Sequence, residues 1–143
     1  AVAEVINRPD RGIELAANLT NATRQSADIG KSAIIWQASG FVPGKGTLQD
    51  EMLARAGYRN ASAQFGLGQW DQLPLETLMR SPPDIIFVSS TAAGEDARAL
   101  TLRNRLLGKL GKRVRVVPFP DRLLLCGGPS MIEAMARFRS AGA

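Results

Sequence analysis

The sequence contains no histidine and only one cysteine, Cys126, among its 143 residues. Histidine is the commonest general base and the commonest metal ligand in proteins. General-base catalysis and metal binding would therefore need other residues in this chain. A single cysteine cannot form an internal disulfide bond or a cluster of thiolate metal ligands. Without histidine, the thiol also lacks its usual activator as a nucleophile. Because three leucines precede Cys126, we expect it to be a structural residue that packs as a small apolar side chain.

The sequence also lacks a long apolar run. No stretch approaches the roughly 18 consecutive apolar residues of a membrane-spanning helix. The first residues, AVAEVINRPDRG, do not show the basic start and apolar run of a signal peptide, so we expect a chain that is cytosolic, already processed or a fragment. A composition that is 45% hydrophobic and 22% charged predicts one globular domain with a sizeable core.

Basic residues outnumber acidic ones, with 18 Lys and Arg against 13 Asp and Glu, for a net charge of +5. The arginines are scattered along the chain, and only the stretch KLGKRVR at 109–115 forms a cluster. Aromatic residues make up 6% of the chain, and no motif that reads a nucleic-acid groove is present. We therefore interpret the excess as a solvated basic surface and expect no nucleic-acid partner.

Apolar strand patterns alternate with helical ones along the chain. The strands are expected at SAIIWQ (32–37), DIIFVSS (84–90) and VRVVPF (114–119). The helices are expected at about 11–25, 47–57, 75–81, 94–107 and 130–140. The segment 58–73 is rich in Gly, Asn, Ser and Gln and is predicted to be mostly irregular surface. This alternation predicts an α/β fold with a parallel sheet covered by helices on both faces.

A glycine-rich loop, SGFVPGKGT (39–47), follows the first strand and resembles a phosphate-binding loop. That motif needs Gly, four residues and then Gly-Lys-Ser/Thr, so that backbone N–H groups surround the anion and the hydroxyl reaches magnesium. Here only three residues separate Gly40 from Gly44, and Gly46 separates Lys45 from Thr47. The spacing disfavours a phosphate site, and a nucleotide- or phosphate-binding α/β enzyme is kept as the alternative function.

Ligands of parallel α/β sheets bind beyond the carboxyl ends of the strands. This rule points to the loop 39–47, the turn 89–94, the loop 119–129 and the segment around Trp70. Phe41 and Trp70 fall in these loops, and they are either ligand contacts or buried anchors of the loops. A receiver-type regulatory domain would need clustered acidic residues at strand ends, whereas Asp84 stands at a strand start.

Four stretches in order carry a resemblance to a known family. They are IIWQASGFVPGKGT, LARAGYRN, LPLETLMRSPPDIIFVS and RVVPFPDRLLLCGGPSMIEAMARF. From Gly12 onward the chain resembles the carboxyl-terminal lobe of the periplasmic binding proteins that serve cobalamin, haem and iron-siderophore ABC importers. The resemblance implies a Rossmann-like lobe at 31–143, preceded by a connector (backbone) helix region at 1–30. It also implies that the amino-terminal lobe is missing and that the chain is a fragment.

The resemblance further implies a binding function rather than catalysis. The full-length protein would be periplasmic, or lipid-anchored outside the cytoplasm, and would deliver a metal-chelate or tetrapyrrole ligand to an ABC transporter permease without a cofactor of its own. The implied ligand-binding residues are Gly40, Phe41, Val42, Lys45, Trp70 and Arg122. With no histidine and Tyr58 as the only tyrosine, direct iron coordination by this lobe is not expected.

Glu76 is the residue that the resemblance assigns to permease docking. In the family, a glutamate in the helix before a Pro-Asp-strand phrase pairs with arginines of the permease, and LPLETLMRSPPD matches that phrase. Considered alone, Glu76 is a glutamate in the first turn of a short helix, where it is favourable for the helix dipole and needs no further role.

Overall fold

A computed structural model describes residues 2–89 and 97–143 of the chain. Its centre is a parallel four-stranded sheet in the order β3-β1-β5-β6. The strands are β1 (Ser32–Trp36), β3 (Arg59–Asn60), β5 (Ile85–Ser89) and β6 (Arg115–Phe119). The predicted α/β class with a helix-flanked parallel sheet is confirmed.

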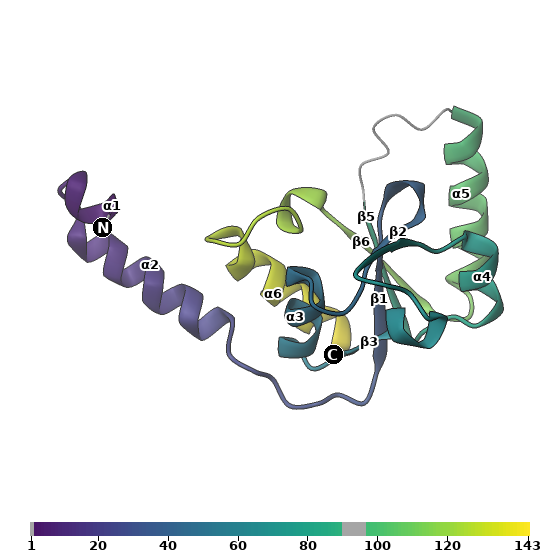
Figure 1. The fold of residues 1–143 in the computed structure, drawn as a ribbon, viewed down its shortest axis with the longest axis horizontal. Helices are drawn as coiled ribbons and strands as arrows, with labels where there is room; N and C mark the ends of the chain where they lie inside the picture. Colours follow the sequence, from purple (N-terminus) through teal and green to yellow (C-terminus); the bar gives the residue numbers. More distant parts are fainter. Residues whose placement is uncertain (1, 90–96) are drawn as a thin grey trace.

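Helices cover both faces of this sheet (Figure 1). The helices α3 (Leu48–Arg55) and α6 (Ser130–Gly142) pack on one face, where they meet Ile35 and Phe87. The helices α4 (Leu75–Arg80) and α5 (Ala97–Leu110) lie over the other face, which carries Ile34 and Trp36. Because alternate residues of each strand enter different cores, the central strands read as continuous apolar runs.

Local signals set the ends of several elements. The Thr47 hydroxyl accepts a hydrogen bond of 3.1 Å from the Asp50 N–H and caps α3, as predicted. Gly57 ends this turn with φ +91°, and a Cβ there would lie 2.3 Å from the Ala27 carbonyl oxygen. At the amino end of the sheet, the Ser32 N–H and hydroxyl both donate to Asp84, at 2.7 Å, and these bonds lower the pKa of Asp84.

The segment 58–73 is more ordered than predicted. It contains β3 at the edge of the sheet, a 3-10 helix at Ala61–Phe65 and the strand β4 (Trp70–Gln72). Strand β4 pairs antiparallel with β2 (Phe41–Pro43), which lies within the glycine-rich loop. These strands have two and three residues, too few to show a hydrophobic period, and their partners are distant in sequence. The prediction of mostly irregular structure for 58–73 is therefore wrong, whereas most of its residues are exposed, as predicted.

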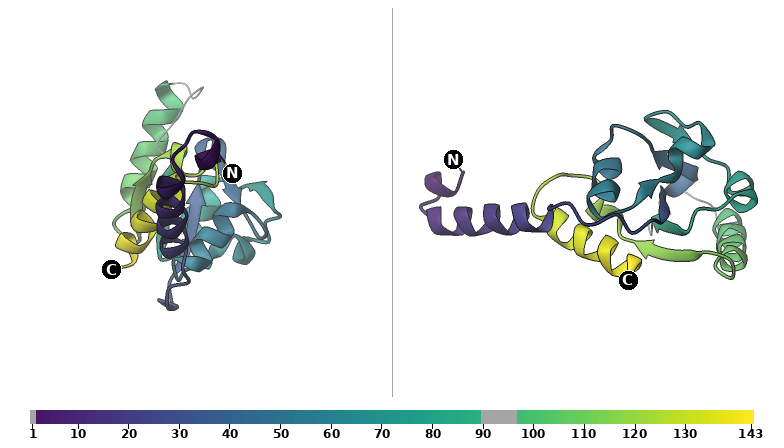
Figure 2. Two further views of the ribbon diagram at one scale, coloured as in Figure 1. Left: turned by 90° about the vertical axis from the view of Figure 1, so that its left-hand side faces the viewer. Right: turned by 90° about the horizontal axis from the view of Figure 1, so that it is seen from below.

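The chain begins with α1 (Val2–Val5) and α2 (Pro9–Ala22), and α2 extends away from the sheet (Figures 1 and 2). None of the described residues of these two helices is buried, so the apolar face predicted for 11–25 is largely exposed. After α2, the chain is held to the lobe by Arg139, whose guanidinium donates to the Arg24 carbonyl oxygen at 2.8 Å and to the Ser26 hydroxyl at 2.9 Å. In the described ranges, no helix has both the length and the apolar character needed to cross a bilayer.

Candidate functional site

Two exposed aromatic side chains lie on one face of the β2–β4 ribbon. Phe41 pairs with Gln72, and Pro43 pairs with Trp70. Alternate residues of a strand share a face, so Phe41 and Trp70 are diagonal neighbours on the same face. Phe41 is 44% exposed and Trp70 is 53% exposed. They are therefore not buried anchors of their loops, and the alternative left open by the sequence is decided in favour of an exposed aromatic pair.

The glycines of the loop let parts of this chain approach one another. Gly40 has φ +79°, and a Cβ there would lie 2.9 Å from the Leu73 carbonyl oxygen. A Cβ at Gly44 would lie 2.0 Å from the Gly68 carbonyl oxygen, so only glycine allows the two sides of the ribbon to close. The protein's own backbone therefore accounts for the glycines at these two positions, and the ligand contact of Gly40 stays a prediction.

The prediction that Val42 contacts a ligand is wrong for its side chain. Its side chain points to the other face of the ribbon from Phe41 and is fully buried in the core with Leu73 and Leu78. A buried valine offers no side-chain surface to a ligand, so it supports the ribbon instead.

The donors of the glycine-rich loop are turned toward its own chain. The Gly44 N–H donates to Gln69 at 2.8 Å, and the Gly46 N–H donates to the Asp50 carboxylate at 3.0 Å. The Thr47 hydroxyl donates to the Gly44 carbonyl oxygen at 2.9 Å. These groups would have to leave their partners to hold a phosphate, so the geometry argues against the alternative function as the spacing did. Lys45, at the tip of the loop, is exposed.

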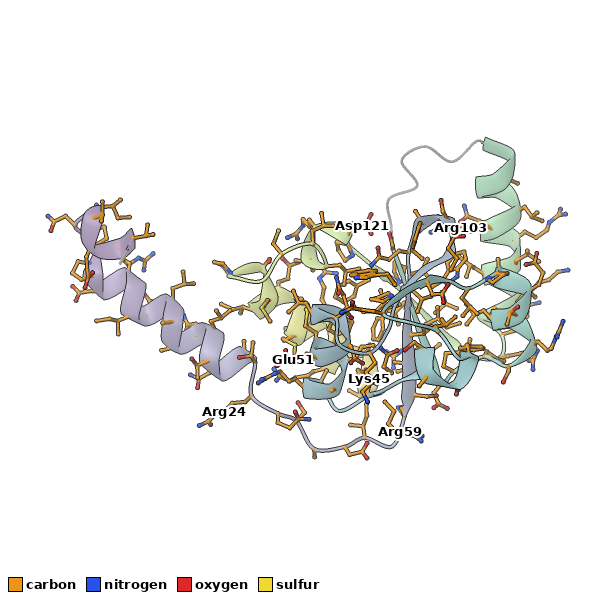
Figure 3. The ribbon with its side chains drawn as sticks, in the orientation of Figure 1. Arg24, Lys45, Glu51, Arg59, Arg103 and Asp121 are labelled. Carbon is orange, nitrogen blue, oxygen red and sulfur yellow. The ribbon has the colours of Figure 1, made fainter. Side chains whose placement is uncertain are left out.

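The carboxyl ends of β5 and β6 carry a polar cluster that the sequence pattern does not predict. The Ser89 hydroxyl donates to Asp121, and the Arg103 guanidinium donates to the Ser89 carbonyl oxygen at 2.8 Å. Arg103 also lies over the ring of Trp36, 5.4 Å from its centroid. Asp121 and Arg103 lie along the same edge of the lobe (Figure 3). The position of Asp121 just after a strand was the available signal. The predicted turn 89–94 falls mostly outside the described residues.

Arg122, another predicted ligand contact, lies on the surface in the 3-10 helix Asp121–Leu123, beside the first turn of α6. Its guanidinium donates to both carboxylate oxygens of Glu133, at 2.8 and 2.9 Å. Arg137 also pairs with Glu133, at 3.0 Å. The Arg122 hydrogen bond, followed by that of Arg137, lowers the pKa of Glu133. Arg122 is exposed, but it already has a carboxylate partner for which a ligand would compete.

Cys126 is exposed, so its predicted structural role is wrong. Of the three leucines before it, Leu123 and Leu124 are buried while Leu125 is 73% exposed. The chain turns in a short 3-10 helix at Asp121–Leu123, and this turn separates the side chains of consecutive leucines. The run of apolar residues that precedes Cys126 therefore ends at the surface of the protein.

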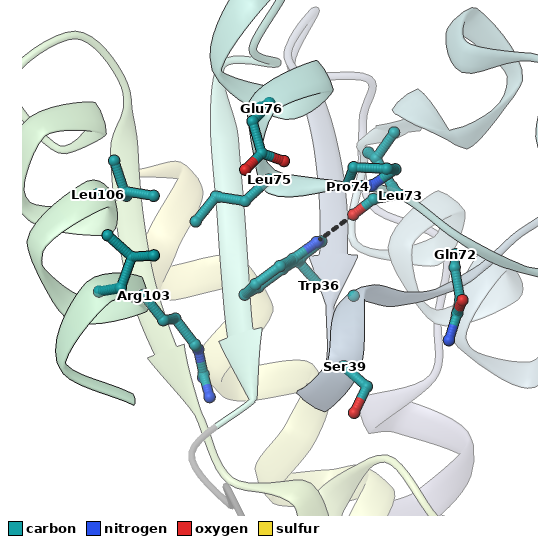
Figure 4. A pocket seen from close by; sticks show the side chains of 11 residues that line it. Trp36, Ser39, Gln72, Leu73, Pro74, Leu75, Glu76, Arg103 and Leu106 are labelled. Carbon is teal, nitrogen blue, oxygen red and sulfur yellow. Dashed lines mark hydrogen bonds between the residues drawn. The ribbon is translucent and has the colours of Figure 1, made fainter. Parts of the chain in front are cut away.

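A pocket of about 430 Å³ lies between α4 and α5 (Figure 4). Its walls include Trp36, Leu75, Glu76, Leu102, Arg103 and Leu106. The side chain of Trp36 lies among the other lining residues, and its indole N–H donates a hydrogen bond of 2.9 Å to the Leu73 carbonyl oxygen. Glu76 is exposed on the rim, and within the described ranges it makes neither a hydrogen bond nor an ion pair.

Solved structures of similar fold span more than this chain. The periplasmic heme-binding protein RhuT from Roseiflexus sp. RS-1 is 25% identical with a TM-score of 0.64, and the match covers 99% of this chain and 60% of that one. The periplasmic heme-binding protein HutB of Vibrio cholerae is 18% identical with a TM-score of 0.65, over 97% of this chain and 59% of that one. An ABC-type Fe3+-hydroxamate transport system of Saccharomonospora viridis is 16% identical with a TM-score of 0.64, over 98% and 52%.

This chain therefore spans about 60% of the length of the first two of these proteins. A comparison with curated proteins finds no match. A family model described as periplasmic binding protein matches residues 1–107, three quarters of the chain and including β1, the ribbon and β5. By this match, the chain belongs to the periplasmic binding protein family.

Proposed function

We propose that the protein is the solute-binding component of an ABC importer, which captures a haem, cobalamin or ferric-siderophore type ligand and delivers it to a membrane permease. The observation that carries this proposal is the exposed pair Phe41 and Trp70 on one face of the ribbon, in a chain of the periplasmic binding protein family. The role is binding rather than catalysis, as in the family to which the chain belongs.

The chemistry of the aromatic pair favours a flat, unsaturated ligand. The faces of an indole and a phenyl ring stack on a macrocycle or a catechol without needing a directional polar match. Lys45 and Arg122 are exposed and add positive charge, which suits propionates or an acidic siderophore. We propose Gly40 only as the backbone support of this face, since its own surface is buried.

The proposal includes a second lobe. Residues 1–30 serve as the connector region and 31–143 as the carboxyl-terminal lobe, with an amino-terminal lobe of the same protein closing over the ribbon. Two observations support this arrangement. The helices α1 and α2 and the turn between them expose Val2, Val5, Ile6 and Ile13, and the similar structures are longer than this chain. The complete protein would act in the periplasm, or lipid-anchored outside the cytoplasm. The names of two structural relatives, RhuT and HutB, describe those proteins as periplasmic.

The ligand assignment is tested by titrating haem, cyanocobalamin and ferrichrome separately into the protein in its full natural length, followed by fluorescence quenching. Trp70→Ala and Phe41→Ala should each weaken the preferred ligand roughly tenfold, because each removes a stacking surface. Trp70→Phe is the matched control and should retain most of the affinity. Equal binding by all variants would contradict the aromatic site, and the absence of binding to any of the three ligands would contradict the ligand class.

Glu76 is proposed as the residue that docks on the permease. Its carboxylate is exposed and without a partner among the described residues, as pairing with an arginine of another protein requires. Glu76→Ala should leave folding and ligand affinity unchanged and reduce ligand-dependent stimulation of the transporter ATPase. Glu76→Arg should reduce it further, since like charges would then face each other. Normal stimulation by both variants would leave only the helix-dipole role.

A further inference from the structure

The pocket between α4 and α5 is lined mainly by apolar side chains, and the carboxylate of Glu76 lies beside them. We propose that this pocket receives an apolar side chain of the membrane partner, next to an arginine or lysine of that partner that pairs with Glu76. The proposal rests on the proposed function and deepens it, because it adds an anchor residue and a pocket to what would otherwise be a single surface ion pair.

The walls of the pocket are suited to an apolar anchor. Leu102 is 57% exposed although it stands at the mouth of a pocket of about 430 Å³ with Leu75 and Leu106 in its walls. An exposed leucine at such a mouth gains burial only when something fills the space beside it. Binding energy at protein interfaces is concentrated where a side chain enters a well-packed pocket of this kind.

The floor of the pocket is rigid before any partner arrives. Trp36 is buried, and its indole N–H is held by the Leu73 carbonyl oxygen at 2.9 Å. Arg103 covers one side of the indole and is itself held by the Ser89 carbonyl oxygen at 2.8 Å. A preformed floor lowers the entropy lost on association, which favours tight contact with an incoming side chain.

The charge at the rim selects a basic partner. Glu76 has no ion pair within the described residues, not even with Arg80, which lies one turn along α4. Arg103 points along Trp36 on another side of the pocket from Glu76 (Figure 4). A purely apolar partner would desolvate this carboxylate without a counter-charge, at a net cost. An apolar side chain accompanied by a cation fits both the hollow and its rim.

The pocket also adjoins the proposed ligand site. Ser39, Gly40 and Gln72 line it, and Gln72 pairs with Phe41 in the ribbon. A partner anchored here would therefore touch the base of the element that carries the exposed aromatic pair. This continuity places docking and ligand release at one edge of the lobe.

The test uses the protein in its full natural length and, as its probe, the permease and ATPase encoded with it, reconstituted in lipid nanodiscs. Leu102→Ala should raise the Kd for the nanodisc complex roughly tenfold, as loss of an interface anchor does, and Leu102→Lys should raise it more by setting a cation near the partner's own. Leu102→Met conserves the apolar volume and should bind normally. Asn104→Lys is the charge-matched control, because Asn104 is exposed on α5 and does not line the pocket.

Ligand affinity and thermal unfolding are measured on the same variants and should not change, since Leu102 is exposed on α5 and is not part of the β2–β4 ribbon. If the Leu102 variants bind as Asn104→Lys does while Glu76→Ala binds weakly, the pocket is not an anchor site, and the docking role of Glu76 stands without it. If Leu102→Ala and Glu76→Ala both bind normally, docking through this face is overturned altogether. A wild-type protein that binds ligand but not the nanodisc complex would overturn the anchor and the permease partner together.

Discussion

The two tryptophans of the chain occupy opposite environments and do different work. Trp36 lies on β1, 5% exposed, with its indole N–H bonded to Leu73. Trp70 lies on β4, exposed beside Phe41. One ring holds the sheet against α4 and α5, and the other offers a free surface. Composition alone does not separate them, but a single substitution at each position does.

We predict that Trp36→Ala lowers the free energy of unfolding by about 3 to 5 kcal/mol, because it leaves a cavity in the core and removes the partner of the Leu73 carbonyl oxygen. Trp70→Ala should change the free energy of unfolding by no more than about 0.5 kcal/mol, since its ring buries little surface. Urea melts of the two variants measure the difference directly. A larger loss for Trp70→Ala would mean that Trp70 is an anchor of its loop.

At the scale of elements, the β2–β4 ribbon is the feature on which the candidate site depends. It is built from two strands of three residues, and its closure requires a glycine where the strands begin to separate. Gly44 and Gly68 face each other at this point, but only one of them is crowded. A Cβ at Gly44 would meet the Gly68 carbonyl oxygen at 2.0 Å, whereas a Cβ at Gly68 would meet nothing within 4 Å.

Gly44→Ala is therefore expected to lower the free energy of unfolding by about 1 to 3 kcal/mol, because the backbone of the ribbon must move to admit the methyl group. It should also weaken ligand binding, since Trp70 moves with β4. Gly68→Ala is the matched control and should be neutral or slightly stabilising, because alanine restricts the unfolded chain. Chemical melts and ligand titrations of both variants provide the measurement. Equal behaviour of the pair would show that the ribbon is not held by this contact.

At the scale of the whole molecule, α1 and α2 leave the lobe and carry apolar side chains into solvent. The region where α2 meets the lobe is loosely filled, with a cavity of about 230 Å³ lined by residues that include Leu19, Met52 and Met131. Within the lobe, in contrast, both faces of the sheet are closed by helices. The contrast supports the proposal that α2 connects this lobe to another.

The two-lobe proposal predicts that these 143 residues alone bind haem, cyanocobalamin or ferrichrome with a Kd well above micromolar. A site shared between lobes loses about half its contact surface when one lobe is absent. The same titrations on a chain that includes the proposed amino-terminal lobe should give a Kd at least a hundredfold lower, and the exchange of backbone amides in α2 should slow. Micromolar or tighter binding by the 143-residue chain would contradict a shared site.

The sequence by itself determined the α/β class, the order of the main strands and helices, the capped start of α3 and the family resemblance. These features depend on short-range physics. Runs such as SAIIW and IIFV are apolar because both faces of their strands are buried. A threonine caps a helix through a residue three positions away, and a glycine ends it through its own backbone angle.

Only the tertiary structure decided what depends on contacts between distant residues. Pairing of β2 with β4 joins residues about 30 positions apart, and three-residue strands carry no period by which to find it. The same pairing buries Val42 and exposes Phe41. It also brings Gly44 so close to the Gly68 carbonyl oxygen that only glycine fits there. The polar contacts of Ser89 and Arg103 and the pocket beside Glu76 likewise arise where separate elements meet. Cys126 was misjudged for this reason, because a turn in three dimensions, and not the leucines before it, placed its side chain at the surface.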